Sequence, residues 1–356
     1  MTATLIGSAP PADVHDVALY DLDGVVYLGD EPVVHAADTI QVAAERGLRP
    51  LYVMNNSSRE PEDIAAQIAG FGVECTPDQV VTSAQSVALL LQEVLEPGAR
   101  VLPVGGPGLR TALEEAGFTI VTSAADEPAA VVQGFAPDLS WRDLAEAAYA
   151  IGAGARHVAT NLDGSIPKER GIAPGNGALV RAVVEATGVE PLASGKPLPA
   201  IFQQAAERVG ARSPMAVGDR LDTDLEGARA SGVPGLLVLT GVTTARDAVL
   251  AAPHQRPSLL ATDLRGLLER HPEPHHVDDG GWWSCGAAVA RVDDGVLVLV
   301  DDPTGPLGPS GEQRLAGDRP ATVSLDGWRA LCVAAWDAAD RGVPVRPEDV
   351  PHLTIG

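Results

Sequence analysis

Residues 17–29 of the chain have the sequence VALYDLDGVVYLG. The apolar run at 17–21 predicts a buried strand, and it leads into Asp21-Leu22-Asp23-Gly24. Ligands of open parallel sheets bind beyond the carboxyl ends of the strands, so two carboxylates at this point are well placed for chemistry. On an extended chain Asp21 and Asp23 point the same way, Leu22 faces the packed side and Gly24 permits a sharp turn. Alone, the motif is also compatible with an ordinary surface turn.

Around this stretch, short apolar runs alternate with amphipathic, Ala-rich segments. That alternation predicts βα units on a parallel sheet and therefore an α/β fold. We expect strands over 17–21, 49–54, 101–105, 130–134, 156–160, 215–219 and 235–241, and helices over 34–46, 61–69 and 199–209. One continuous sheet of so many strands would be unusual. The sequence therefore favours a doubly wound core that is interrupted by an inserted α/β domain.

The expected domain boundaries follow from this division. We assign residues 14–79 and 189–270 to the core, 80–188 to the insertion, and 271–356 to a linker and a small α+β extension. The extension contains a predicted hairpin that turns at Asp294-Gly295, followed by a helix over 326–340. The linker carries His271, His275 and His276, which we interpret as solvated linker residues and not as a metal site.

The composition is that of a soluble globular protein, with 45% apolar and 21% charged residues among 356. A formal net charge of −23 disfavours nucleic acids and anionic membranes as partners. An anionic small substrate would need a metal, local cations or helix N-termini at its site. Three cysteines without CxxC spacing argue for a reducing compartment. No signal peptide or membrane span is recognisable, so we expect a cytoplasmic protein.

A second acidic cluster, GDRLDTD at 218–224, also follows an apolar run. It should lie at the same edge of the sheet as Asp21. A hard oxygen site built from Asp21, Asp23 and Asp219 suits Mg²⁺, which takes few carboxylates and keeps several waters. Asp222 and Asp224 either orient those waters or cap the next helix, and for Asp222 we favour capping.

Two further motifs offer groups that bind anions. Lys196, in SGKP at 194–197, precedes the helix expected over 199–209 and is either an anion clamp or an ordinary solvated lysine. Asn55 and Asn56, in NNSS at 55–58, present amide donors ahead of a helix and can also cap it. Both motifs lie at boundaries between α/β elements.

In their order along the chain, these four motifs resemble those of the haloacid dehalogenase superfamily of phosphatases. The segments DLDGVVYLG, NNSSR, GKP and GDRLDTD are similar to the subfamily with a large α/β cap inserted between the second and third motifs. The resemblance extends over residues 17–270. It implies a Rossmann-like core with a cap, and the activity of a Mg²⁺-dependent phosphomonoesterase.

The resemblance also implies a role for each matching residue. Asp21 is expected to be the nucleophile that forms an aspartyl-phosphate, and Asp23 the acid and base. Asp219, the Asp21 carboxylate and the main-chain carbonyl of Asp23 would hold Mg²⁺, with Asp224 outside them. Lys196 would neutralise the phosphoryl group, and phosphoryl transfer needs such positioning and charge stabilisation. In the inserted cap, Arg170 and Asn176 are the expected substrate-binding residues. The alternative is that they lie in an exposed loop and at a helix cap without contacting substrate.

One residue departs from the family pattern. Met54 stands where the family has Thr or Ser, whose hydroxyl binds a phosphoryl oxygen, and a thioether cannot donate a hydrogen bond. Because losing one such donor costs on the order of 10²–10³ in rate, we expect a slow enzyme. A catalytically weakened phosphate-ligand sensor is the alternative.

The expected substrate is a small phosphorylated metabolite, namely a polyol or sugar phosphate, with glycerol 3-phosphate as the leading candidate. This choice rests on a whole-chain resemblance to actinobacterial phosphatases that carry a C-terminal extension. Phosphoglycolate and nucleotide monophosphates stay open. The extension itself weakly resembles a fragment of an acetyltransferase-type domain, for which a regulatory or dimer-forming role is a hypothesis.

Overall fold

The computed structural model describes residues 5–168, 170–277, 281–301, 311–317 and 319–356. The chain forms two compact units. The first comprises Met1–Pro50 and Ala211–Gly356, and the second comprises Leu51–Gly210. The first unit is thus built from two separate parts of the chain. Boundaries between core, insertion and extension at 79/80, 188/189 and 270/271 stay a prediction.

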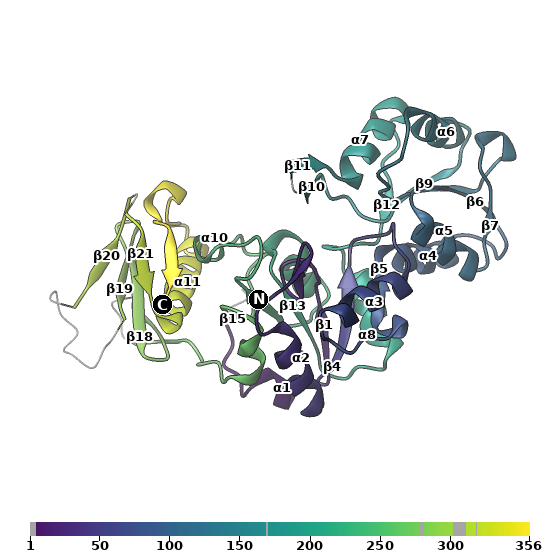
Figure 1. The fold of residues 1–356 in the computed structure, drawn as a ribbon. Helices are drawn as coiled ribbons and strands as arrows, with labels where there is room; N and C mark the ends of the chain where they lie inside the picture. The colour runs from purple at the N-terminus through teal and green to yellow at the C-terminus, as the bar shows by residue number, and fades with distance from the viewer. Residues whose placement is uncertain (1–4, 169, 278–280, 302–310, 318) are drawn as a thin grey trace. The chain divides into compact units, whose positions relative to one another are not determined.

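The first unit contains a parallel sheet with the strand order β15-β14-β13-β1 (Figure 1). Its strands are β1 (Val17–Tyr20), β13 (Pro214–Gly218), β14 (Gly235–Val238) and β15 (Leu259–Ala261). All four residues of β1 are buried, as the apolar run predicts. Strands β1 and β13 pair in parallel from Val17 with Pro214 to Tyr20 with Val217, so their carboxyl ends lie side by side. Asp21 and Asp219 follow directly after them.

Helices and turns connect these strands. They are α1 (Pro11–Val14), α2 (Ala36–Glu45), the π-helical turn η3 (Leu221–Leu225), α9 (Glu226–Ala230), α10 (Ala245–Val249) and the 3₁₀-helix η4 (Leu264–Leu268). A short antiparallel pair, β2 (Tyr27–Leu28) and β3 (Glu31–Pro32), follows the first acidic motif. Gly24 has a φ of 88°, a conformation that favours glycine, so the predicted sharp turn is confirmed.

The C-terminal part of this unit is an antiparallel sheet, β16-β17-β18-β19-β20, with one long helix and one further strand pair. The elements are β16 (His275–His276), β17 (Trp283–Cys285), β18 (Ala288–Asp293), β19 (Val296–Val300), β20 (Gln313–Leu315), β21 (Ala321–Val323), α11 (Leu325–Asp340), η5 (Pro347–Asp349) and β22 (Leu353–Ile355). The predicted hairpin turns at Asp294 and Gly295, both with positive φ. Helix α11 shares one apolar cluster with β14, β15 and α10, so this region docks on the parallel sheet.

One expectation about the linker is wrong. His271 is buried, with 5% of its surface exposed, and is not a solvated linker residue. Its Nε2 donates to the Gly266 carbonyl at 2.8 Å, and its Nδ1 accepts from Arg329 of α11 at 3.2 Å. Burial lowers the pKa of this imidazole, which is therefore held neutral. His275 and His276 are exposed, as expected.

The second unit contains the parallel sheet β12-β9-β8-β6-β7 and the parallel pair β4-β5. Its elements are β4 (Arg49–Met54, which starts in the first unit), α3 (Pro61–Gly70), η1 (Pro77–Gln79), β5 (Val80–Thr82), α4 (Ser83–Val94), β6 (Arg100–Val104), α5 (Pro107–Glu115), β7 (Thr119–Ile120), η2 (Ala124–Asp126), β8 (Ala130–Gln133), α6 (Trp141–Gly152), β9 (Arg156–Ala159), β10 (Ser165–Lys168), β11 (Gly171–Pro174), α7 (Asn176–Thr187), β12 (Leu192–Ala193) and α8 (Ala200–Arg208). Apolar clusters against α4 and α5 and against α6 and α7 cover the five-stranded sheet. The α/β alternation predicted for 101–160 is confirmed.

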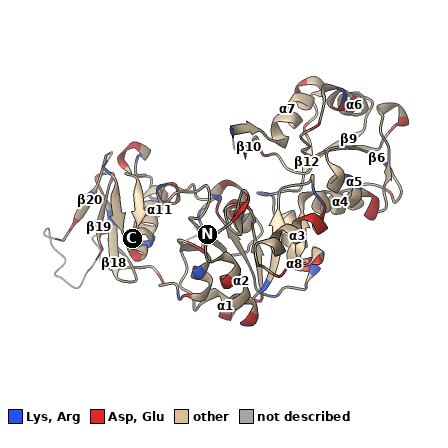
Figure 2. Cartoon of the chain, viewed as in Figure 1, with Lys and Arg blue, Asp and Glu red and all other residues tan. Residues whose placement is uncertain are grey.

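Among the described residues, every helix is too short or too polar to cross a lipid bilayer. Acidic residues are distributed over the helices and loops of both units, as the red segments of Figure 2 show, in keeping with the net charge of −23.

Candidate active site

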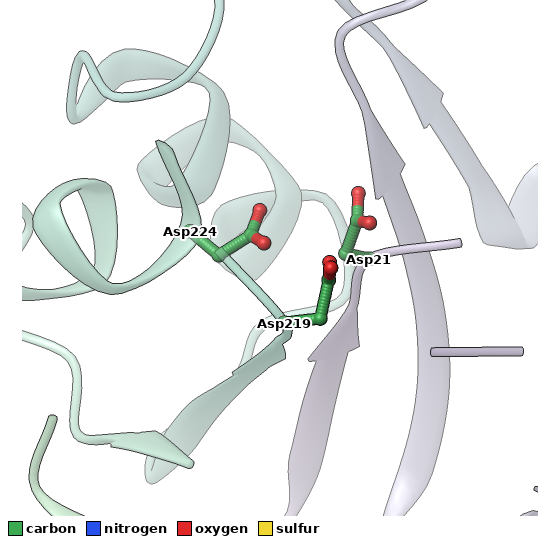
Figure 3. Close-up of side chains that lie close together, drawn as sticks. All are labelled: Asp21, Asp219 and Asp224. Carbon is green, nitrogen blue, oxygen red and sulfur yellow. The ribbon is translucent and has the colours of Figure 1, made fainter. Parts of the chain in front are cut away.

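Three aspartates of the first unit converge where β1 and β13 end (Figure 3). Asp21 follows β1, and Asp219 and Asp224 follow β13. Each offers a carboxylate oxygen, and these oxygens all lie within 4.8 Å of one another. Asp219 and Asp224 are buried, with 0% and 2% of their surfaces exposed, whereas Asp21 is half-buried. The two acidic motifs, nearly 200 residues apart in sequence, therefore form one cluster.

Main-chain groups hold two of these carboxylates in place. Val242 N–H donates to Asp219 Oδ2 at 2.6 Å, and Arg220 N–H donates to Asp224 Oδ2 at 3.1 Å. The strand end must also lack a side chain at Gly218, because a Cβ there would lie 2.2 Å from the Cβ of Asp224. Within the described part of the chain, the buried Asp219 Oδ1 has no hydrogen-bond partner.

The cluster is electrostatically unfavourable on its own. Desolvation by burial, followed by the charges of Asp21 and Asp224, raises the pKa of Asp219 to about 8. A divalent cation would offset both effects and would occupy the open coordination position of Asp219 Oδ1. Mg²⁺ prefers hard oxygen ligands such as carboxylates, and it usually binds one or two of them directly and keeps several waters. The residues present therefore fit a magnesium ion.

The other two aspartates of these motifs lie outside the cluster. Asp23 is exposed at the turn after β1, where Gly24 N–H donates to the Tyr27 carbonyl at 2.7 Å. The expectation that Asp222 caps a helix is wrong. Its carboxylate instead accepts from Arg220 Nε at 3.1 Å and Nη2 at 2.8 Å, because the π-helical turn brings the two side chains together.

In the second unit, Lys196 and Asn55 form a second group of predicted site residues. Lys196 is buried, with 3% of its surface exposed, and its Nζ lies 5.9 Å from the centre of the Phe202 ring. Asn55 Oδ1 accepts from Lys196 N–H at 2.7 Å, and Asn55 Nδ2 donates to the Lys196 carbonyl at 3.1 Å. The Asn55 side chain is thus bonded to the main chain of the lysine and fixes its position.

The two residues that complete this group, Asn161 and Asp163, are not among the individual residues that the sequence predicts for the site. Asn55 Nδ2 also donates to Asp163 Oδ2 at 3.0 Å, and Asn161 Nδ2 donates to the Asn55 carbonyl at 2.8 Å. Both lie in the segment ATNLD at 159–163, which the sequence marks as polar but does not pair with Asn55. The segment after β9 is therefore joined to the end of β4 by side-chain hydrogen bonds.

The remaining predicted residues of this unit are dispersed. Asn56 is exposed, and its Oδ1 accepts from Ser58 N–H at 2.7 Å, which is a local turn-capping contact. Arg170 is exposed in the turn between β10 and β11. Asn176, at the start of α7, is 1% exposed, and its amide donates to the carbonyls of Gln133 and Asn161. Substrate binding by these residues stays a prediction.

Met54 is the last residue of β4 and is 7% exposed. It pairs in register with Thr82 of β5. Because Asn55 follows it directly, Met54 stands at the strand end that carries the polar group around Lys196. The residue that breaks the family pattern therefore lies next to that group.

Two models of known protein families match segments of the chain that carry site residues. The model described as haloacid dehalogenase-like hydrolase matches residues 18–119, and the model described as HAD-hydrolase-like matches residues 193–267. These two segments carry all four motifs. The chain belongs to the haloacid dehalogenase-like hydrolases.

Particular relatives narrow the class to phosphatases. The chain is 46% identical over 298 residues to the D-glycerol 3-phosphate phosphatase of Mycobacterium tuberculosis, covering 82% of this chain and 83% of that protein. It resembles the crystal structure of a glycerol phosphate phosphatase from that organism in complex with magnesium, with a TM-score of 0.79, 38% identity and coverage of 98% and 95%. A p-nitrophenyl phosphatase from Archaeoglobus fulgidus gives a TM-score of 0.67 at 28% identity, covering 71% of this chain and 98% of that one.

Proposed function

We propose that this protein is a Mg²⁺-dependent phosphomonoesterase that hydrolyses glycerol 3-phosphate through an aspartyl-phosphate. The observation that carries the proposal is the cluster of Asp21, Asp219 and Asp224, in which the buried Asp219 Oδ1 has no hydrogen-bond partner among the described residues and could bind a metal. The 46% identity to a D-glycerol 3-phosphate phosphatase supports the choice of substrate. A bound Mg²⁺ would supply charge neutralisation for the carboxylates and the phosphoryl group.

In the first half-reaction, an Asp21 carboxylate oxygen attacks phosphorus and the bond from phosphorus to the glycerol oxygen breaks. Asp23 donates its proton to that oxygen, and the alcohol leaves. Asp23 suits this role because it is exposed at the edge of the sheet and lies outside the carboxylate cluster. A carboxyl group away from the metal can carry the proton that its neighbour cannot.

In the second half-reaction, the Asp23 carboxylate takes a proton from water and the water oxygen attacks phosphorus. The bond between phosphorus and the Asp21 oxygen breaks, which releases inorganic phosphate and restores Asp21. Lys196 supplies a positive charge for the phosphoryl oxygens throughout both steps. The paired hydrogen bonds of Asn55 to its main chain keep it in place.

A substrate panel tests this assignment against its alternatives. Phosphate release from glycerol 3-phosphate, phosphoglycolate and nucleotide monophosphates should be measured with Mg²⁺ and with EDTA. We expect the highest kcat/KM for glycerol 3-phosphate and no turnover in EDTA. A preference for another member of the panel would reassign the substrate and leave the reaction class intact.

Replacing Met54 by Thr should accelerate the enzyme. The hydroxyl would add a phosphoryl donor at the end of β4, so we expect kcat/KM to rise by about 10- to 100-fold. Met54→Val is the matched control because it changes size and branching without adding a donor, and it should not gain activity. If neither the wild type nor Met54→Thr turns over any phosphate ester, the chain is a sensor of phosphorylated ligands.

Metal binding should appear as a pH-dependent gain in stability. The folded, metal-free protein holds the Asp219 pKa at about 8, above the value of about 4 in an unfolded chain. The metal-free protein therefore loses stability as the pH rises from about 4 to 8, because Asp219 ionises more readily in the unfolded chain. Bound Mg²⁺ offsets that loss. We expect saturating Mg²⁺ to raise the Tm by about 5 °C at pH 8 and by less at pH 5.5.

Asp219→Asn is the control for this measurement. Removing the buried charge should raise the Tm of the metal-free protein at pH 8 and abolish the Mg²⁺-dependent increase. A Tm increase with Mg²⁺ that persists in Asp219→Asn would mean that the ion binds elsewhere.

We further propose that the protein is cytoplasmic, does not bind nucleic acid and forms a homodimer. The net charge of −23 supports the exclusion of nucleic acid, because the surface would repel a phosphate backbone. Light scattering on the full chain measures the oligomeric state directly, and a monomer mass would contradict the dimer.

A further inference from the structure

The loop at 239–244, between β14 and α10, holds the Asp219 side chain. Besides the bond from Val242 N–H to Asp219 Oδ2, Thr243 N–H donates to the Asp219 carbonyl at 3.1 Å. Gly241 lies so close that a Cβ there would be 2.1 Å from Asp219 Oδ2. The orientation of this carboxylate therefore depends on where the loop is held.

The loop is anchored at both of its ends. At its start, the Thr240 hydroxyl donates to the Gly24 carbonyl at 2.5 Å, next to the first acidic motif. At its other end it continues into α10, where Thr244 is the N-cap and exchanges hydrogen bonds with Asp247. A helix of five residues is too short to be stable by itself, so its position must come from packing.

Helix α11 of the C-terminal region provides that packing. Ala245, Ala248 and Val249 are buried in the apolar cluster that contains the two tryptophans of α11. Trp328 Nε1 donates to the Ala245 carbonyl at 2.9 Å, and Trp336 Nε1 donates to the Ala248 carbonyl at 3.0 Å. Figure 1 shows α10 between the parallel sheet and α11.

A third contact comes from α10 itself. Arg246 Nε donates to the Val350 carbonyl at 2.7 Å, and the same guanidinium donates to the Pro347 carbonyl. The short helix is therefore tied to the C-terminal region along its whole length. Of these ties, the one from Trp328 is nearest to the loop, because Ala245 is the first residue after the cap.

We propose that Trp328 is a positioning residue for the magnesium site: it holds the first turn of α10, and through it the main-chain donor that orients Asp219. The C-terminal region then has a role in catalysis without contributing a residue to the site. This inference rests on the proposed function, in which Asp219 is a metal ligand.

Trp328→Phe tests the proposal because it removes the indole donor and keeps an aromatic ring. Magnesium affinity should be measured by calorimetry on the full-length protein, alongside the Mg²⁺ dependence of phosphate release. Groups that contact a metal ligand directly change affinity by 10- to 100-fold when they are lost. Trp328 does not contact Asp219 and acts on it through α10 and the loop, so its effect should be smaller. Trp328→Phe should weaken Mg²⁺ binding by about 3- to 10-fold, and saturating Mg²⁺ should restore kcat.

Trp282→Phe is the matched control. Trp282 lies in the same C-terminal region and packs against Val289, Val298 and Val300. The Arg291 Cζ lies 4.7 Å from the centre of its ring. This variant can lower the Tm, but its Mg²⁺ affinity should equal that of the wild type. Arg246→Met loosens α10 at a half-buried position and should also weaken Mg²⁺ binding. It provides a second test if Trp328→Phe folds poorly.

Two outcomes would overturn the inference. Wild-type Mg²⁺ affinity in a folded Trp328→Phe, or in Arg246→Met when Trp328→Phe does not fold, would leave these residues a purely structural role. If Trp282→Phe weakened Mg²⁺ binding as much as Trp328→Phe does, any disturbance of the C-terminal region would lower Mg²⁺ affinity, and Trp328 would have no specific role. Failure of the proposed function is recognised separately: Asp219→Asn would still bind Mg²⁺ if Asp219 is not a metal ligand, and the wild type would release no phosphate if the protein is not a phosphatase.

Discussion

Replacing Asp21 by Asn is expected to reduce phosphate release by roughly 10⁴-fold or more. An amide has the shape of the carboxylate but cannot attack phosphorus, so the aspartyl-phosphate cannot form. The substitution also removes one of the three acidic side chains that lie close together where β1 and β13 end. We therefore expect the metal-free protein to be at least as stable as the wild type, and the loss to fall on kcat.

Asp222→Asn is the matched control for this experiment. Asp222 belongs to the second acidic motif, but its carboxylate pairs with Arg220 at the surface. The activity of Asp222→Asn should stay within about twofold of the wild type, since an exposed ion pair contributes little to stability. An Asp21→Asn variant that keeps more than a few per cent of wild-type kcat, with deamidation excluded by mass spectrometry, would remove Asp21 as the nucleophile.

Replacing Lys196 by Met is expected to lower kcat/KM by about 10²- to 10³-fold. The Met side chain fills similar space beside Phe202 but carries no charge for the phosphoryl oxygens. Lys196 is buried and its main chain is held by Asn55, so the main chain at this position should keep its place in the variant.

Lys196→Arg separates charge from position. It keeps the cation but places it differently, so we expect an intermediate loss and not full rescue. Phosphate release and Tm should be measured together for both variants. Wild-type kcat/KM in Lys196→Met would show that the lysine is a structural residue of the second unit.

Much of this fold could be predicted because local patterns and tertiary contacts agree. The buried run before Asp21 and the run before Asp219 become adjacent parallel strands, so the convergence of both motifs follows from the topology of open sheets. The turn at Asp294-Gly295 is equally predictable, since both residues tolerate positive φ. The turn depends on two neighbouring residues, and the convergence depends on strands whose apolar runs are each recognisable locally.

The partners of individual side chains could not be predicted from the sequence. His271 resembles a solvated linker residue until Arg329, 58 positions later, is placed against it. Asp222 resembles a helix cap, but a π-helical turn lets it pair with Arg220 instead. Nothing in the local sequence around Asn55 indicates that its amide reaches Lys196 and Asp163. Each case depends on side-chain geometry that periodicity does not contain.

The central claim is that the Asp21 carboxylate receives the phosphoryl group. Its most direct test is to mix the protein with glycerol 3-phosphate and Mg²⁺, quench in acid within milliseconds, and map the phosphorylated peptide by mass spectrometry. We predict a phosphoryl group on Asp21 that requires Mg²⁺ and is absent from Asp21→Asn. Turnover with the phosphoryl group on another residue, or with no phosphorylated protein when hydrolysis of the intermediate is rate-limiting, would contradict the account.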